Sequence, residues 1–251
     1  MDNFVNDHEI KLIALDMDGT LFNDDRQISI GNREAIKEVQ ERGIFVVLST
    51  GRSIMTCGEH ADSLELTSYL VTVNGSEIWD EKRDLVERNI VKSEFIQWMW
   101  ELSQRHETRF WAISTDKMWF DEMPGDIHDR EWLKFGFDID DDDVREIILK
   151  ELQEKGEFEL SNSSLKNIEV NPIGINKANG LKIVCRKLGI DMENVMAVGD
   201  SLNDMAMIKE AGIGVAMGNA QEVLKEAADW VTATNNEDGV AKAIRKWVLK
   251  N

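Results

Sequence analysis

IKLIALDMDGT, residues 10 to 20, decides the fold of this chain of 251 residues. The apolar run up to residue 15 is typical of a buried strand, and Gly19 marks the turn that follows it. Asp16 and Asp18 occupy alternate positions of an extended backbone, so we expect their side chains to meet at the carboxyl end of the strand. Open α/β sheets bind their ligands at that end.

Two carboxylates this close repel each other unless a cation or a shared proton lies between them. The pair therefore predicts a metal site, an acid/base pair, or an aspartyl nucleophile with a proton-handling neighbour. An ordinary Asp-Gly turn is the alternative that the pentapeptide alone leaves open.

Strands and helices alternate at both ends of the chain, which predicts a parallel sheet flanked by helices. Ser29 is the expected N-cap of one helix, and Gly43 follows its end. The expected strands are 10–15, 44–50, 69–73, 194–200, 213–217 and 229–233. The expected helices are 30–42, 53–66, 178–188, 203–210, 221–227 and 237–249.

The middle of the chain is different, because it is rich in tryptophan and mixes short strand candidates with two expected helices, 93–105 and 142–154. The strand candidates read TRFWAIS, KMWF, EFELS and LKNIEV, and the acidic run DIDDDD, 138 to 143, suits a helix start. This order predicts an α+β domain, 80–172, inserted into an α/β domain formed by 1–79 and 173–251.

Composition narrows the functional classes. The chain has 29 Lys and Arg against 48 Asp and Glu, a formal charge of −19, which argues against binding nucleic acid or anionic membranes. No apolar run approaches the roughly 18 residues of a membrane span, and MDNFVNDHEIK at the start is too polar for a signal peptide. With only two cysteines, a reducing, cytoplasmic location is expected. The four histidines are scattered along the chain, so a zinc site is not expected. We expect a monomer or a weak homodimer.

Three further motifs follow DMDGT in a fixed order: LSTGR at 48 to 52, Lys177 within GINKANGLK, and GDSLND at 199 to 204. With these four motifs the chain resembles a haloacid dehalogenase (HAD) superfamily phosphatase of the Cof-like branch, type IIB. The resemblance implies a Rossmann-like core with an inserted α+β cap. Ala178 departs from the pattern, because many relatives have glycine after the lysine.

The resemblance implies a role for each motif residue. Asp16 would be the nucleophile that forms an aspartyl-phosphate and also a ligand of Mg²⁺. Asp18 would be the general acid/base, contacting the metal through its backbone carbonyl. Asp200 would bind the metal directly, and Asp204 would act through water or by orienting Lys177. The expected phosphate or substrate ligands are Thr50, Gly51, Arg52, Asn74, Lys177 and Asn203, with Ser49 competing with Thr50.

The predicted function is Mg²⁺-dependent hydrolysis of a small phosphorylated metabolite. Sugar phosphates, nucleotide-cofactor precursors and cofactor phosphates are the candidate substrates. A hexose phosphate phosphomutase with the same intermediate and a non-catalytic phospholigand-binding protein are the alternatives. The cap would choose the leaving group and gate access. A ring could stack on Trp111, Trp119 or Trp132, although aromatic side chains in such strands more often fill the cap's own core.

Overall fold

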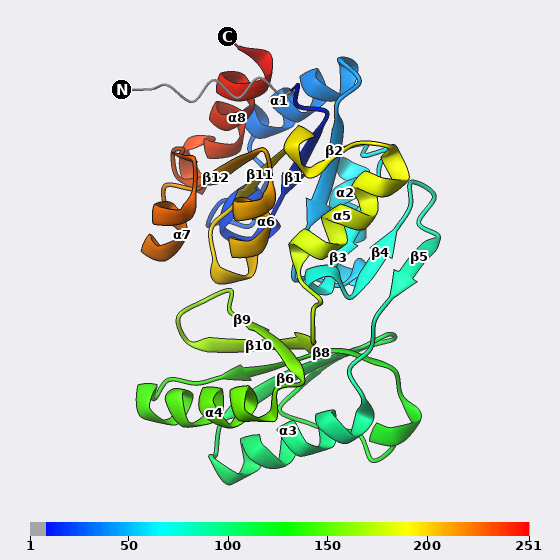
Figure 1. Ribbon diagram of the computed structural model, residues 1–251, viewed down its shortest axis with the longest axis vertical. Helices are drawn as coiled ribbons and strands as arrows, with labels where there is room; N and C mark the ends of the chain where they lie inside the picture. The colour runs from blue at the N-terminus through cyan, green and yellow to red at the C-terminus, as the bar shows by residue number, and fades with distance from the viewer. Residues whose placement is uncertain (1–8, 251) are drawn as a thin grey trace.

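A computed structural model describes residues 9–250, so most of the segment tested for a signal peptide lies outside the described residues. The described chain forms two sheets, each with its own helices (Figure 1). None of the helices in this range is long and apolar enough to cross a membrane.

The first sheet has eight strands in the order β13-β12-β11-β1-β2-β3-β4-β5. The pairs from β13 to β3 are parallel, whereas β4 and β5 add an antiparallel edge. The strand bounds are β1 (Leu12–Leu15), β2 (Phe45–Ser49), β3 (Leu70–Thr72), β4 (Glu77–Trp79), β5 (Leu85–Arg88), β11 (Val195–Gly199), β12 (Ile213–Ala216) and β13 (Trp230–Val231). Because β1 lies between β2 and β11, the ends of these three strands meet at one place.

Helices flank this parallel sheet and bury its apolar strands in one large core. Helix α1 packs against α8, and α5 packs against α6 and against β2 and β3. The helices are α1 (Ile30–Glu41), α2 (Ile54–Ser63), α5 (Lys177–Leu188), α6 (Met205–Glu210), α7 (Glu222–Ala227) and α8 (Gly239–Ile244). Ser29 caps α1 by accepting a hydrogen bond from the amide of Asn32, as the sequence predicted.

The second sheet is antiparallel, in the order β7-β6-β8-β10-β9. Its strands are β6 (Arg109–Ser114), β7 (Met118–Phe120), β8 (Trp132–Asp138), β9 (Phe158–Ser161) and β10 (Asn167–Pro172). Helices α3 (Ser93–Arg105) and α4 (Asp142–Lys155) lie beneath it, on the side away from the first sheet (Figure 1). Asp141 of the acidic run caps α4, which agrees with the expected helix start.

The strands of the second sheet alternate between two faces. One face carries Phe110, Phe135, Phe137, Ile168 and Val170, which pack into a separate core with α3 and α4. On the other face, the register places Trp111 opposite Gly136, and Gly136 opposite Glu169. The parallel sheet with its flanking helices, and the antiparallel sheet with α3 and α4, confirm the predicted fold class, while β4, β5 and β8 were not predicted as strands.

Candidate active site

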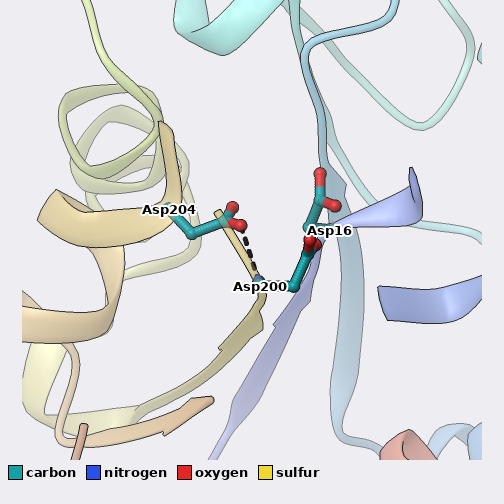
Figure 2. Close-up of side chains that lie close together, drawn as sticks. All are labelled: Asp16, Asp200 and Asp204. Carbon is teal, nitrogen blue, oxygen red and sulfur yellow. Dashed lines mark hydrogen bonds between the residues drawn. The ribbon is translucent and has the colours of Figure 1, made fainter. Parts of the chain in front are cut away.

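Three carboxylates meet at the carboxyl end of the parallel sheet. Asp16 follows β1, Asp200 follows the neighbouring strand β11, and Asp204 lies in the turn that leads into α6. Their side chains approach one another from these three positions (Figure 2), and one oxygen of each lies within 4.8 Å of the others. This position follows from the topology, because adjacent parallel strands end at the same edge.

Lys177, the first residue of α5, neutralises two of these carboxylates. Its Nζ lies 2.6 Å from Asp16 Oδ1 and 2.7 Å from Asp204 Oδ1, and its side chain is completely buried. Burial alone would lower the pKa of Lys177, but the two carboxylates outweigh it and raise that pKa. Lys177 is therefore a fixed buried cation at the edge of the sheet.

Both carboxylate oxygens of Asp204 accept hydrogen bonds from the protein itself. Its Oδ1 binds Lys177, while its Oδ2 accepts hydrogen bonds from the backbone amides of Asp200 (2.9 Å) and Ser201 (3.1 Å). These contacts fit the expectation that Asp204 orients Lys177, a role that stays a prediction.

Asp200 is held in place through both of its carboxylate oxygens. Thr20 donates to Oδ1 at 3.0 Å, and Ser201 donates to Oδ2 at 2.8 Å. The backbone of Gly19 lies directly against this carboxylate: its φ is +80°, and a Cβ there would stand 2.6 Å from Asp200 Oδ2. The glycine of DMDGT is therefore required both by the left-handed turn and by the close approach of Asp200.

The electrostatics of the cluster favour a cation. Burial raises the pKa of Asp16 well above its ordinary value, against the opposing charge of Lys177. Burial and the charge of Asp204 raise the pKa of Asp200 to about 6. Hard carboxylate oxygens in this number suit Mg²⁺. Asp16 Oδ2 accepts no hydrogen bond within the described residues, and each oxygen of Asp200 accepts one, whereas Asp204 accepts one on Oδ1 and two on Oδ2. Asp16 and Asp200 therefore have more lone pairs left for a metal than Asp204 has.

Asp18 lies apart from this cluster. Its carboxylate is half-exposed and accepts two hydrogen bonds from Arg52, each of 2.6 Å, in a bidentate pair. The hydrogen bond to Asp18 raises the pKa of Arg52. The side chain of Asp18 is thus oriented by Arg52. The expected contact of its backbone carbonyl with a metal stays a prediction.

The predicted phosphate ligands gather around the same edge. Thr50 is buried, and its Oγ1 accepts a hydrogen bond from the amide of Arg52 at 3.2 Å. Ser49 Oγ is also buried and has no hydrogen-bond partner in the described chain. Asn74 Nδ2 donates to Glu169 Oε2 at 2.7 Å, and Asn203 Nδ2 approaches the same oxygen at 3.4 Å.

A cavity of about 430 Å³ joins this edge to the second sheet. The edge of the first sheet contributes polar groups to the lining, including Asp16, Asp18 and Arg52. The second sheet contributes an apolar wall, which consists of Trp111, Ile113, Met118 and Phe120. One end of the cavity is therefore built for charge and the opposite wall for an apolar group.

Of the three tryptophans proposed for stacking, only Trp111 lines this cavity. Trp119 and Trp132 are buried in the core of the second sheet, as the packing alternative predicted. Trp111 packs directly on Gly136, where a Cβ would stand 2.1 Å from its ring. Because Gly136 has no side chain, the indole of Trp111 can lie against the sheet.

Sequence reasoning missed a buried ion pair in the same wall. Lys134 Nζ lies 2.7 Å from Glu169 Oε2 and 5.0 Å from the centre of the Trp111 ring. Burial lowers the pKa of Lys134 despite the opposing charge of Glu169. Burial would raise the pKa of Glu169, but Lys134, Asn74 and Ser163 together lower it. The signal in the sequence was a charged residue between apolar neighbours, Lys134 in WLKFGF and Glu169 in IEV.

The sequence and the fold of the chain are both similar to those of known proteins. A family model described as haloacid dehalogenase-like hydrolase matches residues 13–131 and 124–244. The 5-amino-6-(5-phospho-D-ribitylamino)uracil phosphatase YcsE of Bacillus subtilis is 61% identical over 97% of this chain and 98% of that protein. A haloacid dehalogenase-like hydrolase structure from Bacteroides thetaiotaomicron is 32% identical, with a TM-score of 0.78 over 95% of this chain and 99% of that one. Another from B. subtilis is 25% identical, with a TM-score of 0.87 over 95% of this chain and all of that one.

Proposed function

The chain belongs to the haloacid dehalogenase-like hydrolases and is a phosphoric monoester hydrolase, and from this premise we propose that its substrate is 5-amino-6-(5-phospho-D-ribitylamino)uracil. The observation that carries the proposal is the cavity with Asp16 at one end and Trp111 in the opposite wall. A phosphate at the charged end would leave the planar uracil ring to the apolar wall, where an indole face favours stacking. The 61% identity to a phosphatase of that name supports the same substrate.

We propose that Asp16 is the nucleophile. A carboxylate oxygen of Asp16 attacks phosphorus, the new oxygen–phosphorus bond forms, and the bond to the ribityl oxygen breaks. Asp18 gives its proton to the departing ribityl oxygen and then removes a proton from the water that attacks the phosphorylated Asp16. Phosphate leaves and both carboxyl groups return to their starting states. In the described structure both oxygens of Asp18 accept hydrogen bonds from Arg52, so the guanidinium would have to turn from Asp18 to the substrate before these proton transfers take place.

Cations must balance the charge that builds up during this transfer. Lys177 lies 2.6 Å from Asp16 and is placed to neutralise both that carboxylate and the phosphate. Mg²⁺ held by Asp16, Asp200 and the backbone carbonyl of Asp18 would supply further positive charge to the phosphate oxygens. Thr50, Gly51 and Asn203 are the proposed hydrogen-bonding partners of the phosphate.

The test is a product analysis. The purified protein is incubated with the phosphoribitylaminouracil and Mg²⁺, and free phosphate and the dephosphorylated amine are quantified. We expect free phosphate and the dephosphorylated amine in equal amounts, and we expect neither product after EDTA is added. An isomerised ester without free phosphate would replace the proposal with a mutase. Faster hydrolysis of a hexose phosphate would refute the proposed substrate.

We also propose the division into a core of 1–79 and 173–251 and a cap of 80–172, with the cap excluding water from the cavity. We place the protein in the cytoplasm, because both cysteines are buried free thiols. A monomer or a weak homodimer is the proposed state, and light scattering on a concentration series tests it.

A further inference from the structure

The loop that joins β9 to β10, residues 162–166, is bound to the GDSLND motif of the core, and we call it the cap loop. The amide of Asn203 donates to the carbonyl of Asn162 at 3.0 Å. Gln221 Nε2 donates to the side-chain oxygen of Asn162 at 2.9 Å. In both hydrogen bonds the core supplies the donor and the cap loop supplies the acceptor.

The cap loop is tied firmly to the second sheet. Oδ1 of Asn167, the first residue of β10, accepts hydrogen bonds of 3.1 Å from the amides of Ser163 and Ser164. Its Nδ2 donates to Ser163 Oγ at 2.9 Å, and that hydroxyl donates to Glu169 Oε1 at 2.9 Å. The carbonyls of the cap loop therefore move with the cap as one body.

Ser201 connects the cap loop to the carboxylate cluster. Its Oγ lies 2.8 Å from Asp200 Oδ2 and 3.2 Å from the carbonyl oxygen of Ser163. A hydroxyl carries a single proton, so these two acceptors compete for it. Ser201 and Ser163 both line the cavity, so this shared hydrogen bond closes the cavity wall between core and cap. The strength of one contact therefore depends on the strength of the other.

A charge change at Asp200 should shift this competition. A cation held by Asp200 would offset the carboxylate charge and make Oδ2 a weaker acceptor, because ionised acceptors form the stronger hydrogen bonds. The proton of Ser201 would then turn to the carbonyl of Ser163 and strengthen the contact with the cap loop. We propose that Ser201 is a positioning residue that couples docking of the cap loop to cation binding by Asp200. Coupling of this kind is reciprocal, so a docked cap loop also favours the cation.

The inference rests on the Mg²⁺ site of the proposed function and adds a link between that site and the cap. Hydrogen exchange of two neighbouring amides tests it without measuring activity. The Asn203 amide reports docking, because its acceptor belongs to the cap loop. The Asp204 amide donates to the carbonyl of Ser201 at 3.0 Å within the core, so it reports a general tightening of the motif.

Exchange is measured by NMR on the full chain without Mg²⁺ and at a Mg²⁺ concentration that calorimetry shows to be saturating. In the wild-type protein Mg²⁺ is expected to slow exchange at Asn203 about 5-fold more than at Asp204. Ser201→Ala removes the shared proton, so the two amides should then be slowed within about 2-fold of each other. Gln221→Ala is the matched control, because it loses a hydrogen bond to the cap loop but keeps its amide on the carbonyl of Asp200. It should exchange faster at Asn203 in both conditions and keep the wild-type difference.

Equal slowing of the two amides in the wild-type protein would overturn the inference, and that measurement needs no variant. A difference that survives in folded Ser201→Ala would overturn it as well, since a structural role for the hydroxyl would leave docking and cation binding independent. If calorimetry finds no Mg²⁺ binding to the wild-type protein, the proposed metal site fails and the inference fails with it. Mg²⁺ binding without the difference in exchange removes the inference alone and leaves the proposed function standing.

Discussion

The two sides of the cavity are built on opposite principles. At the edge of the parallel sheet, Asp200 and Asp204 use both carboxylate oxygens in hydrogen bonds or ion pairs. On the facing sheet, the wall is apolar apart from Lys134 and Glu169, and Phe120 at the rim is 62% exposed. The carboxylates on the first side are held in place by their hydrogen bonds. The wall on the second side is an apolar surface with few polar groups to orient a ligand.

This difference assigns the reaction to the edge of the parallel sheet and the choice of leaving group to the facing wall. Fixed charges stabilise a developing charge without having to reorganise, so changes there should act on every substrate alike. An apolar wall discriminates by contact area, so changes there should act on one leaving group more than on another. The comparison fails if a wall variant slows all esters equally or if a carboxylate variant slows only one.

The largest effect is expected from Asp16→Asn. An amide cannot act as the nucleophile, so kcat should fall by about 10⁴-fold or more for every phosphate ester. Release of phosphate from several esters is the measurement, and Asp25→Asn, an exposed change in the following loop, is the matched control. Since Lys177 keeps its contact with Asp204, the variant should stay folded. Residual turnover within 100-fold of wild type would contradict the nucleophile assignment.

A smaller but still general effect is expected from Gly19→Ala. The new methyl group would stand 2.6 Å from Asp200 Oδ2 at a φ of +80°, so the carboxylate or the turn must move. The Mg²⁺ concentration for half-maximal activity should rise by about 10- to 100-fold. Gly43→Ala has a similar φ of +79° with nothing within 4 Å, so it separates backbone strain from displacement of Asp200. An unchanged Mg²⁺ requirement in Gly19→Ala would remove Asp200 from the metal site.

The same contrast explains what the sequence could predict. DMDGT and GDSLND each follow a buried strand, and parallel strands bring their ends together, so Asp16 and Asp200 could be placed in advance. Lys134 and Glu169 could not, because they meet only through the pairing of β8 with β10, and β8 itself was not predicted. The dipeptide Asn74-Gly75 is a turn signal in the sequence, and Asn74 does have a left-handed φ of 58°. Its hydrogen bond to Glu169 depends on how the two sheets face each other.

Trp111→Ala tests whether the wall selects the leaving group. Loss of a stacking surface costs about 1–3 kcal/mol for a nucleobase, so kcat/KM for the phosphoribitylaminouracil should fall by about 10-fold. D-ribitol 5-phosphate carries no ring, and its hydrolysis should change by less than about 2-fold. Trp111→Phe keeps an aromatic face and should recover most of the activity. Equal losses with both esters would show that Trp111 supports the fold of the cavity and not the ring.

Phe120→Ala should give the smallest effect and marks where the wall ends. The side chain is 62% exposed and lies at the end of β7, so it stands at the open rim, where a ligand in the cavity covers only part of its area. KM for the ring-bearing ester should rise by about 2- to 3-fold, with kcat unchanged, because an interaction equal in the ground and transition states lowers only KM. The free energy of unfolding should stay within about 0.5 kcal/mol of wild type, as for other exposed positions. A loss as large as that of Trp111→Ala would mean that the cap closes further over the substrate and brings Phe120 onto the ring, which would extend selection by the wall to its rim.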